Sequence, residues 1–288
     1  MPDRQPTIAV LYPGELGAGL GALLKSRGAR VVTTVAGRGE RTVGRCRDAG
    51  IVVLDSLADV ARESDFVISL VPPAAAEEQA AHYLATAARP GALYIDCNSV
   101  GPQLARLLAA RFTAAGRAFV DAAINGLAKN LTTSATLFLS GARAADVEQL
   151  VSDAMRVRNL GPEPGRASAM KMLLAGLSKG ICALYLELAM VARHDGMLGE
   201  MIEACTLIYP GVAALADRML PTYAQHASRR ATEMSELEST VRAAGVEPCV
   251  TGAVRNLHES LAAEKFDADV STVNALVERL ATSGFLKK

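Results

Sequence analysis

The chain has 288 residues, of which half are hydrophobic and about a fifth are charged, and its formal net charge is zero. This length favours two domains, and the absence of a basic stripe or interleaved aromatic residues gives no support to nucleic-acid binding. Five scattered cysteines without metal-ligand spacing are expected to be buried thiols in a reducing compartment. No charged and then apolar leader precedes the first predicted strand, so we expect a cytoplasmic protein.

The first predicted strand, residues 7–12, leads directly into a glycine-rich turn and a helical pattern. This order is typical of a dinucleotide site, in which glycine admits the pyrophosphate and the next helix offers free N–H groups. Glycines at Gly17–Ala22 have the literal spacing but lie inside the predicted helix, so we prefer the register Tyr12–Gly17. The predicted cofactor-binding residues of this turn are Tyr12, Pro13, Gly14, Glu15 and Leu16, with Tyr12 in place of the usual turn glycine.

Strand-like runs alternate with amphipathic segments through the first half of the chain. They cover residues 7–12, 30–35, 51–54, 66–71, 92–95 and 118–121. This alternation predicts a parallel, doubly wound sheet. Strand-like runs at 135–139 and 156–160, with a helical stretch at 143–153 between them, precede the breaker cluster Gly161–Gly165. We therefore predict an α/β Rossmann-type domain over residues 1–164.

Helical periodicity dominates the remainder, and we predict an all-α domain over residues 165–288. The predicted helices cover about 166–195, 198–208, 211–219, 222–244, 249–263 and 270–283. The first would be a long interdomain helix of ~45 Å, apolar on most faces. One small domain cannot cover it, so we expect a homodimer. Lys171, Lys179 and Glu187 interrupt its apolar sequence, which argues against a membrane span.

Four segments together resemble a known family. They are the strand–glycine start, Asp96–Pro102, Phe119–Gly126 and the helix that carries Lys171. Their order and spacing are similar to those of the β-hydroxyacid dehydrogenases related to 6-phosphogluconate dehydrogenase. The second half, with Ser178–Gly180 and Arg229–Met234, looks more like a little-characterised branch with a divergent helical domain. The resemblance implies an NAD(P)-dependent dehydrogenase or reductase acting on CH–OH groups.

Oxidising a hydroxy acid, or reducing a keto acid, needs a proton acceptor or donor beside the reacting oxygen. Lys171 is our candidate, and the resemblance implies the same acid/base role for a lysine at this position. Lys171 lies in the apolar stretch Ala169–Leu174. Desolvation there is expected to lower its pKa toward neutrality, whereas a lysine that simply extends to solvent would fit the same helical spacing.

The family usually has an asparagine one turn after the lysine, and here that position is Ala175. Its hydrogen bond must be supplied elsewhere or not needed. Ser178 is a candidate replacement. Lys179, about two turns after Lys171, is a candidate for binding a substrate anion, and a solvated or interface lysine explains it equally well.

Two further segments carry candidates for binding a substrate carboxylate. Ser99 precedes Pro102 at a predicted helix start, where a hydroxyl and free N–H groups hold an anion or simply cap the helix. Asn125 and Gly126 stand where the family has a serine-glycine or double glycine that contacts the carboxylate through backbone N–H groups. Turn chemistry alone also explains this Asn-Gly pair.

The predicted cofactor is NADP rather than NAD. NAD enzymes usually carry an acid after the second strand for the ribose hydroxyls. Here the segment Val35–Arg38 contains no acid before Glu40 and presents Arg38, with Arg41 following. Guanidinium groups bind phosphate in a bidentate way and suit a 2′-phosphate.

The remaining assignments concern the nicotinamide pocket, a phosphate contact and the ionisable side chains. Val71 and Pro72 are expected to line the nicotinamide pocket at the end of a strand, although a rigid loop also explains them. The family's phosphate-contacting lysine corresponds to Thr232, and neither flanking arginine, Arg229 or Arg230, is assigned to replace it. We interpret as non-catalytic the histidines and two strand-end acids, His82, His194, His226, His258, Asp96 and Asp121, and predict no metal site.

The sequence therefore predicts an NADP-linked oxidoreductase for a small hydroxy or keto acid, phosphorylated and sugar-derived acids included. Two alternatives stay open. The first is an imine or ketone reductase of the same fold, which the missing asparagine at Ala175 favours. The second is a non-catalytic nucleotide-binding regulator, which Tyr12 and Ala175 favour and Lys171 and Ser99 oppose.

Overall fold

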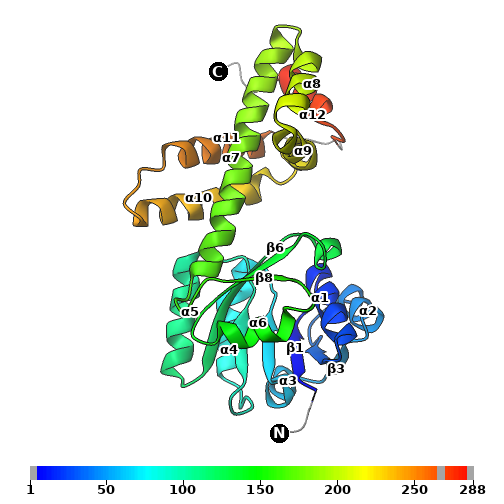
Figure 1. Ribbon diagram of the computed structural model, residues 1–288, viewed down its shortest axis with the longest axis vertical. Coiled ribbons are helices and arrows are strands. Elements are labelled where there is room, and N and C mark those ends of the chain that lie inside the picture. The colour runs from blue at the N-terminus through cyan, green and yellow to red at the C-terminus, as the bar shows by residue number, and fades with distance from the viewer. Residues whose placement is uncertain (1–4, 265–269, 284–288) are drawn as a thin grey trace. The chain divides into compact units, whose positions relative to one another are not determined.

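The computed structural model describes residues 5–264 and 270–283. The chain divides into two compact units, Met1–Lys171 and Met172–Lys288, called here the N-terminal unit and the C-terminal unit. The breaker cluster Gly161–Gly165 lies at the start of helix α7 (Arg166–His194), and the division between the units falls inside this helix (Figure 1). The predicted boundary, after residue 164, lies seven residues before that division.

The N-terminal unit is built on an eight-stranded sheet of order β3-β2-β1-β4-β5-β6-β7-β8. Its strands are β1 (Thr7–Leu11), β2 (Arg30–Thr34), β3 (Val52–Leu54), β4 (Phe66–Ser69), β5 (Leu93–Asp96), β6 (Ala118–Asn125), β7 (Thr136–Ser140) and β8 (Arg156–Asn159). The first six are parallel, as predicted. β7 runs antiparallel to β6, because residues 126–135 are too few for a crossover helix.

Helices cover both faces of the sheet, which explains why β1 is buried along its whole length. Side chains alternate across the strand, so Ile8 and Val10 face one hydrophobic cluster while Ala9 and Leu11 face another. The first cluster includes α1 (Glu15–Ser26), α2 (Glu40–Asp48) and α6 (Ala144–Val151). The second includes α3 (Leu57–Glu63), α4 (Ala76–Leu84) and α5 (Pro102–Ala114). Three short 3₁₀ helices are η1 (Pro73–Ala75), η2 (Ala128–Asn130) and, in the C-terminal unit, η3 (Leu220–Thr222).

The described part of the C-terminal unit is helical, as predicted. After α7 it contains α8 (Leu198–Ile208), α9 (Pro210–Met219), α10 (Ala227–Ala243), α11 (Cys249–Ala263) and α12 (Val273–Ser283). Its main core joins residues of α7, α9, η3, α11 and α12. α10 packs against α7 at Gly176, where an added Cβ would lie 2.1 Å from a methyl group of Leu237. Glycine there permits the two helices to pack.

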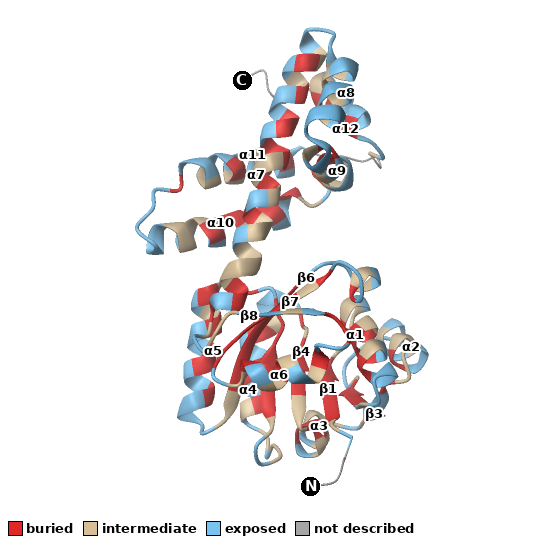
Figure 2. Cartoon of the chain, in the orientation of Figure 1, coloured by how far each residue is buried: buried red, intermediate tan, exposed pale blue. Residues whose placement is uncertain are grey.

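Buried and exposed residues alternate along α7 (Figure 2). Among the described helices, α7 is the one long and apolar enough to cross a membrane by length and composition, with 39% of that stretch buried in the fold. This is weak evidence for a membrane span, because the core helix of a soluble protein meets the same criterion.

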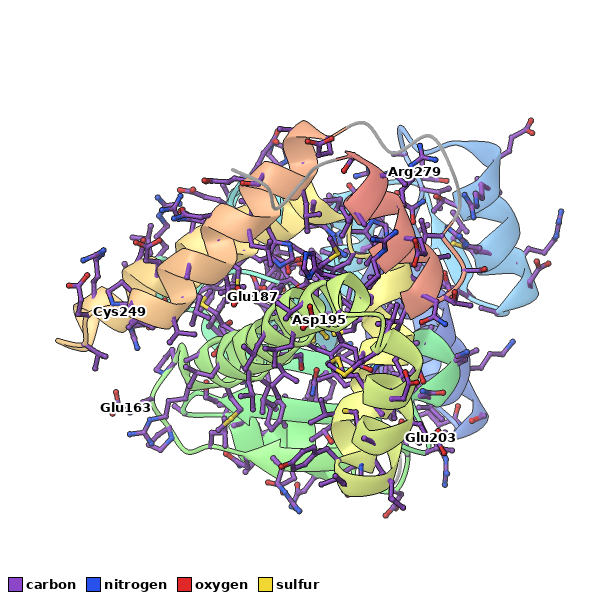
Figure 3. All side chains as sticks on the ribbon, turned by 90° about the horizontal axis from the view of Figure 1, so that it is seen from above. Glu163, Glu187, Asp195, Glu203, Cys249 and Arg279 are labelled. Atoms are coloured by element: carbon purple, nitrogen blue, oxygen red, sulfur yellow. The ribbon has the colours of Figure 1, made fainter. Side chains whose placement is uncertain are left out.

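The expectation that all five cysteines are buried is wrong. Cys46, Cys97 and Cys182 are buried, whereas Cys205 is half-buried and Cys249 is exposed. Cys249 opens α11, and its side chain lies at the edge of the view in Figure 3. Burial of each thiol follows its place in the fold, so residue type alone does not determine its environment.

Candidate active site

The glycine turn lies at the carboxyl end of β1, where the strand order of the sheet reverses between β1 and β4. Ligands of open α/β sheets bind at this position. α1 begins at Glu15 with Gly14 as its N-cap, so the alternative glycine register at Gly17–Ala22 lies inside the helix. A Cβ at Gly14 would meet nothing within 4 Å, whereas a Cβ at Gly17 would lie 3.2 Å from the Cβ of Pro13. The turn thus leaves open space at Gly14 and close packing at Gly17, which suits a pyrophosphate beside the first turn of α1.

Tyr12 differs from the glycine usual at its position in two ways, its backbone conformation and the contact of its side chain. Its φ is 48°, and among the described residues it is the one non-glycine residue with positive φ. Its ring also lies under Arg38, whose guanidinium carbon is 4.0 Å from the ring centroid.

Arg38 itself follows a tight turn after β2. Its N–H donates to the carbonyl of Val35 at 2.9 Å, and Gly37 between them has a φ of 72°. α2 then begins at Glu40, with Gly39 as N-cap and no side-chain cap. Arg38, Glu40 and Arg41 are all exposed, so the first basic groups after β2 face solvent beside a helix N-terminus.

An asparagine that sequence reasoning missed joins two loops of this edge. Asn98 is buried, and its side-chain oxygen accepts a hydrogen bond from the N–H of Val71 at 2.7 Å. Its amide nitrogen donates to Ser69 Oγ at 3.1 Å. Asn98 therefore ties the loop that begins with Val71 and Pro72 to the loop that carries Ser99. A polar residue directly after a buried strand was the signal that could have identified it.

Lys171 and Ser99, which are 72 positions apart in the sequence, meet in the N-terminal unit. Lys171 Nζ donates a hydrogen bond to Ser99 Oγ at 2.6 Å. Ser99 is exposed and lies just before α5, whose N-cap is Gly101 and whose first residue is Pro102. An ammonium group, a hydroxyl and the N-terminus of a helix thus stand together at the carboxyl edge of the sheet, an arrangement that favours an anion.

The first turn of α7, which precedes Lys171, is held by a buried carboxylate. One oxygen of Asp121 accepts hydrogen bonds from the N–H groups of Ala167 at 3.0 Å and Ser168 at 3.1 Å, and from Ser140 Oγ at 2.9 Å. Its other oxygen accepts from Ser168 Oγ at 2.5 Å. A charged cap of this kind stabilises a helix N-terminus. Asp121 therefore acts structurally, by fixing where α7 begins.

Asp96 is the neighbour of Asp121 in the paired strands β5 and β6. It is buried, and its Oδ1 accepts from the N–H of Asn98 at 2.9 Å. Burial raises the pKa of Asp96 to about 7, and the Asp121 carboxylate adds to the rise, while hydrogen bonds from Asn98 oppose it. Asp96 thus combines a structural contact with titration near neutral pH.

Asn125 and Gly126 lie at the far end of β6, which extends beyond the level at which Asp121 pairs with Asp96. Gly126 has a φ of 148°, and a Cβ there would come 2.5 Å from the Cβ of Ala135. The close approach of Ala135 alone requires glycine at this position. The exposed Asn125 side chain remains a candidate contact for substrate.

The two candidates on the next turns of α7 have partners of their own in the C-terminal unit. The Ser178 hydroxyl donates to the carbonyl of Leu174 at 3.0 Å. Lys179 Nζ lies 2.9 Å from Glu233 Oε2, and its side chain is only 6% exposed. That carboxylate balances its charge. Burial acts to raise the pKa of Glu233, but the Lys179 ammonium and its hydrogen bond hold that pKa below the usual value. The structure thus pairs Lys179 with Glu233 rather than presenting it to a substrate anion.

The two arginines that precede Thr232, Arg229 and Arg230, differ in their burial and in their partners. Arg229 is exposed and pairs with Glu233 at 3.0 Å. Arg230 is buried, donates to the carbonyl of Thr222 at 3.1 Å and stacks over the ring of Tyr223. Arg230 therefore supports the core of the C-terminal unit.

His258 is fully buried beside Tyr223, with a ring-centroid distance of 4.6 Å. Neither of its ring nitrogens has a hydrogen-bond partner in the described part of the chain. Burial lowers its pKa to about 4, helped by the charges of Arg230 and Lys179 and opposed by Glu233. No group of three or more metal-ligating side chains occurs among residues 5–264 and 270–283.

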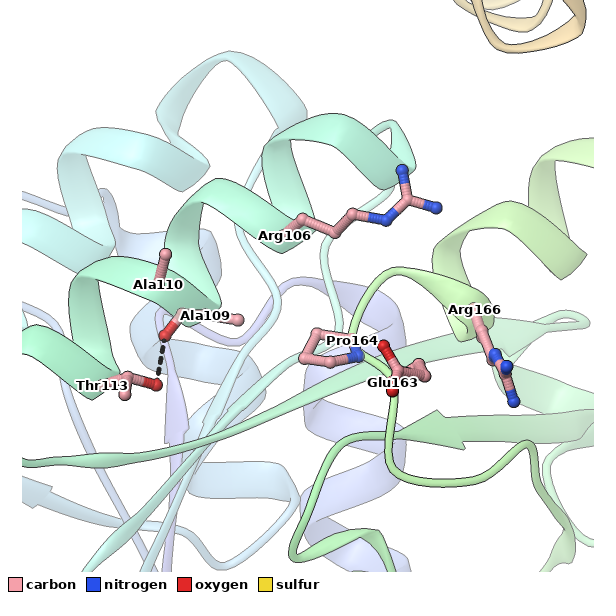
Figure 4. Close-up of a pocket in the computed structure, with 7 residues that line it drawn as sticks. All are labelled: Arg106, Ala109, Ala110, Thr113, Glu163, Pro164 and Arg166. Atoms are coloured by element: carbon pink, nitrogen blue, oxygen red, sulfur yellow. Dashed lines mark hydrogen bonds between the residues drawn. The ribbon is translucent and has the colours of Figure 1, made fainter. Parts of the chain in front are cut away.

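A separate groove runs beside α5. It is lined by Arg106, Ala109, Ala110, Thr113, Glu163, Pro164 and Arg166 (Figure 4). None of the predicted site residues belongs to it. Two arginines and one glutamate are among the residues that line this groove, and we assign it no ligand.

The strand order and the glycine turn at the switch point define a dinucleotide-binding domain. The chain belongs to the family of the NAD-binding domain of 6-phosphogluconate dehydrogenase, whose model matches residues 7–154. The resemblance stated from the sequence is thereby confirmed. Residues 192–261 match a domain of unknown function, DUF1932, which agrees with a divergent helical second half.

Similar proteins support the same fold. An uncharacterised 28.5 kDa protein of Methanothermus fervidus is 27% identical over 86% of this chain and 96% of its own length. A conserved protein of unknown function, described as structurally similar to 3-hydroxyacid dehydrogenases, is 28% identical with a TM-score of 0.72, over 88% of this chain and 96% of that one. 3-Hydroxyisobutyrate dehydrogenase of Mycobacterium tuberculosis, with L-serine, shares the fold at 18% identity and a TM-score of 0.77, over 96% of this chain and 99% of that one.

Proposed function

We propose that the protein is an NADP-dependent oxidoreductase that transfers a hydride to or from a small hydroxy or keto acid, phosphorylated and sugar-derived acids included. The observation that carries the proposal is the hydrogen bond of 2.6 Å between Lys171 Nζ and Ser99 Oγ. It places an ionisable amine and a hydroxyl at the carboxyl edge of a dinucleotide-binding sheet, where a substrate oxygen would need a proton donor or acceptor.

In this mechanism Lys171 accepts the proton of the substrate hydroxyl during oxidation and returns it during reduction. Ser99, at the N-terminus of α5, binds the substrate carboxylate, with Asn125 and the N–H of Gly126 as further contacts. Asp121 holds the first turn of α7 and so keeps Lys171 beside Ser99. NADP, when bound, supplies or accepts the hydride.

The cofactor would lie on the turn of Tyr12, Pro13, Gly14, Glu15 and Leu16, with Val71 and Pro72 on the nicotinamide side. The open space at Gly14 and the absence of an acid between Val35 and Arg38 support this assignment. Arg38 would bind the 2′-phosphate, and this distinguishes NADP from NAD.

The test is a screen that follows the absorbance of the reduced nicotinamide with both cofactors and a panel of hydroxy acids, sugar acids and imines. The proposal expects turnover of a hydroxy or keto acid with NADP. It also expects Arg38→Ala to weaken NADP by ~1.5–3 kcal/mol with little effect on NAD. Equal losses for the two cofactors would remove the 2′-phosphate role.

A matched control is Arg27→Ala. Arg27 is also exposed, but it follows the C-terminal end of α1 and so lies at the other edge of the sheet. Arg27→Ala removes the same charge from the chain as Arg38→Ala does, and it should leave the affinity for both cofactors unchanged.

The second candidate is an imine or ketone reductase. Ala175, in place of the family asparagine one turn after Lys171, favours it, because such substrates need no amide to orient a carboxylate. Turnover of an imine, together with no turnover of any hydroxy or keto acid in the panel, would put this candidate first.

We also propose that the chain forms a homodimer through α7. Leu173, Leu177, Leu184, Leu188 and Val191 are between 48% and 62% exposed and recur at helical spacing, so they form one apolar stripe, with exposed Glu187 at its edge. A stripe on a long helix is suited to its own copy across a two-fold axis, because the same patch serves both partners. Its interface is expected to exceed ~2,000 Å² in total.

Light scattering tests the dimer. The proposal expects twice the 30.1 kDa chain mass at micromolar concentration and a monomer for Leu184→Glu. Glu203→Gln is the control, since Glu203 is exposed on α8 (Figure 3) and lies outside the stripe. A wild-type mass near 30.1 kDa would contradict the proposal.

A further inference from the structure

Tyr12 stands at the first glycine position of the dinucleotide turn, and Gly14 and Gly17 occupy the other two. Its φ of 48° is in the left-handed region, which a bulky side chain rarely adopts. Glycine would take this conformation without strain. Strained residues of this kind persist where the surrounding structure holds them and often mark a functional position.

The ring of Tyr12 has neighbours on two sides. It packs against the apolar cluster of Val71, Val100 and Ala105, which lies under the two loops joined by Asn98. The Arg38 guanidinium lies over the ring, 4.0 Å from its centroid. A planar guanidinium at this distance gains cation–π attraction and stacking, and it loses freedom of rotation.

The backbone delivers Arg38 to this position. The turn closed by the N–H of Arg38 and the carbonyl of Val35 requires the positive φ of Gly37. It brings a residue from the end of β2 to a residue from the end of β1, and these two strands are neighbours in the sheet. Gly39 then caps α2, so Arg38 stands directly before a helix N-terminus.

We propose that Tyr12 determines cofactor specificity: its ring holds the Arg38 guanidinium in place for the 2′-phosphate of a 2′-phosphorylated dinucleotide. The inference rests on the proposed NADP-linked function. An unsupported, exposed arginine would lose side-chain entropy on binding phosphate, and stacking on a fixed ring reduces that loss. A dinucleotide with a free 2′-hydroxyl gains nothing from the arrangement.

The experiment measures dissociation constants for NADPH and NADH by calorimetry, without any substrate, for the wild type, Tyr12→Phe, Tyr12→Gly and Arg38→Ala. Tyr12→Gly should weaken NADPH by about 3- to 30-fold and leave NADH within about 2-fold, because only the stacking contribution is lost. Tyr12→Phe keeps the ring and should bind NADPH like the wild type. In the Arg38→Ala background, Tyr12→Gly should have no further effect on NADPH.

The outcomes separate this inference from the proposed function. A loss of NADPH affinity in Arg38→Ala but not in Tyr12→Gly would overturn the role of Tyr12 and leave the NADP proposal intact. An equal loss for NADPH and NADH in Tyr12→Gly would also overturn it, because the ring would then serve the shared part of the dinucleotide. No effect of Arg38→Ala on either cofactor would overturn the NADP proposal itself. Thermal unfolding verifies that Tyr12→Gly folds, as expected from its positive φ.

Discussion

The two units of the chain use the lysines of α7 differently. In the N-terminal unit, half-buried Lys171 donates to the neutral hydroxyl of exposed Ser99. In the C-terminal unit, buried Lys179 is paired with the carboxylate of Glu233. A carboxylate 2.9 Å away balances the charge of Lys179, whereas the amine of Lys171 lies beside a hydroxyl at the candidate site. Residue type and helix are the same, and the partner determines what each lysine can do.

The two units also differ in the kind of ionisable side chain that they bury. The N-terminal unit buries the acids Asp96 and Asp121, and the second of these caps α7. The C-terminal unit buries Lys179, Arg230 and His258, with Glu233 as the partly exposed balancing acid. Buried acids therefore support the candidate site, while buried bases support helix packing.

The largest expected effect tests the lysine of the N-terminal unit. Lys171→Met should lower turnover by about 10² to 10⁴, the usual contribution of a general acid/base, on the substrate that the screen identifies. Methionine keeps the aliphatic length, so the melting temperature and the dissociation constant for NADPH should change little. Near-normal turnover in steady-state assays would contradict the hydroxyacid dehydrogenase mechanism, and the imine-type reductase would then come first.

The next effect concerns the cap that places this lysine. Asp121→Ala removes the buried acceptor of two backbone N–H groups and of the Ser140 and Ser168 hydroxyls, and should destabilise the N-terminal unit by about 3 to 5 kcal/mol. Asp121→Asn retains an acceptor oxygen and should lose less, about 1 to 2 kcal/mol. Urea denaturation followed by circular dichroism measures both. Equal losses in the two variants would show that charge, rather than the hydrogen-bond acceptor, determines the stability of the cap.

Sequence reasoning succeeded where local pattern determines structure. Alternating apolar runs and helical patterns predicted the parallel sheet, and helical periodicity predicted the helices of the C-terminal unit. Lys171 and Ser99 were predicted for one site, and their hydrogen bond bridges segments that periodicity does not connect. The pairing of Lys179 with Glu233 could not be predicted, because it depends on how α10 packs on α7 at Gly176. Tyr12 was recorded as a departure from the fingerprint, but its contact with Arg38 depends on the turn at Gly37.

The buried acid Asp96 and the buried base His258 predict opposite dependences of folding stability on pH. Folding favours protonated Asp96, whose pKa rises from 3.8 to about 7, so its contribution is complete below pH 3.8 and is lost as the pH rises through 7. Folding favours neutral His258, whose pKa falls from 6.5 to about 4, so its contribution is complete above pH 6.5 and is lost as the pH falls through 4. At about 1.4 kcal/mol per pKa unit, the contribution is at most about 4 to 5 kcal/mol for Asp96 and about 3 to 4 kcal/mol for His258.

Differences in melting temperature between wild type and variant, measured from pH 4 to 8, test this contrast. Asp96→Asn should gain stability relative to the wild type as the pH rises, since it removes the penalty of ionising a buried acid. His258→Phe keeps a ring beside Tyr223 and should gain relative to the wild type as the pH falls. Parallel curves for either variant and the wild type would show that the corresponding group does not titrate in this range.

The smallest effect tests the lysine of the C-terminal unit. Lys179→Met removes the cation that faces Glu233, but Glu233 is partly exposed and retains Arg229 at 3.0 Å, so the stability should fall by only about 1 to 2 kcal/mol. Arg229→Ala, at the exposed side of the same carboxylate, is the control and should change stability by less than about 0.5 kcal/mol. A double variant that also carries Glu233→Leu should recover part of the loss, because it removes the unpaired charge. Denaturant titrations give all three values. If Lys179→Met instead keeps its stability and raises the apparent KM for an anionic substrate, Lys179 binds that substrate as the sequence predicted, and the contrast between the two lysines fails.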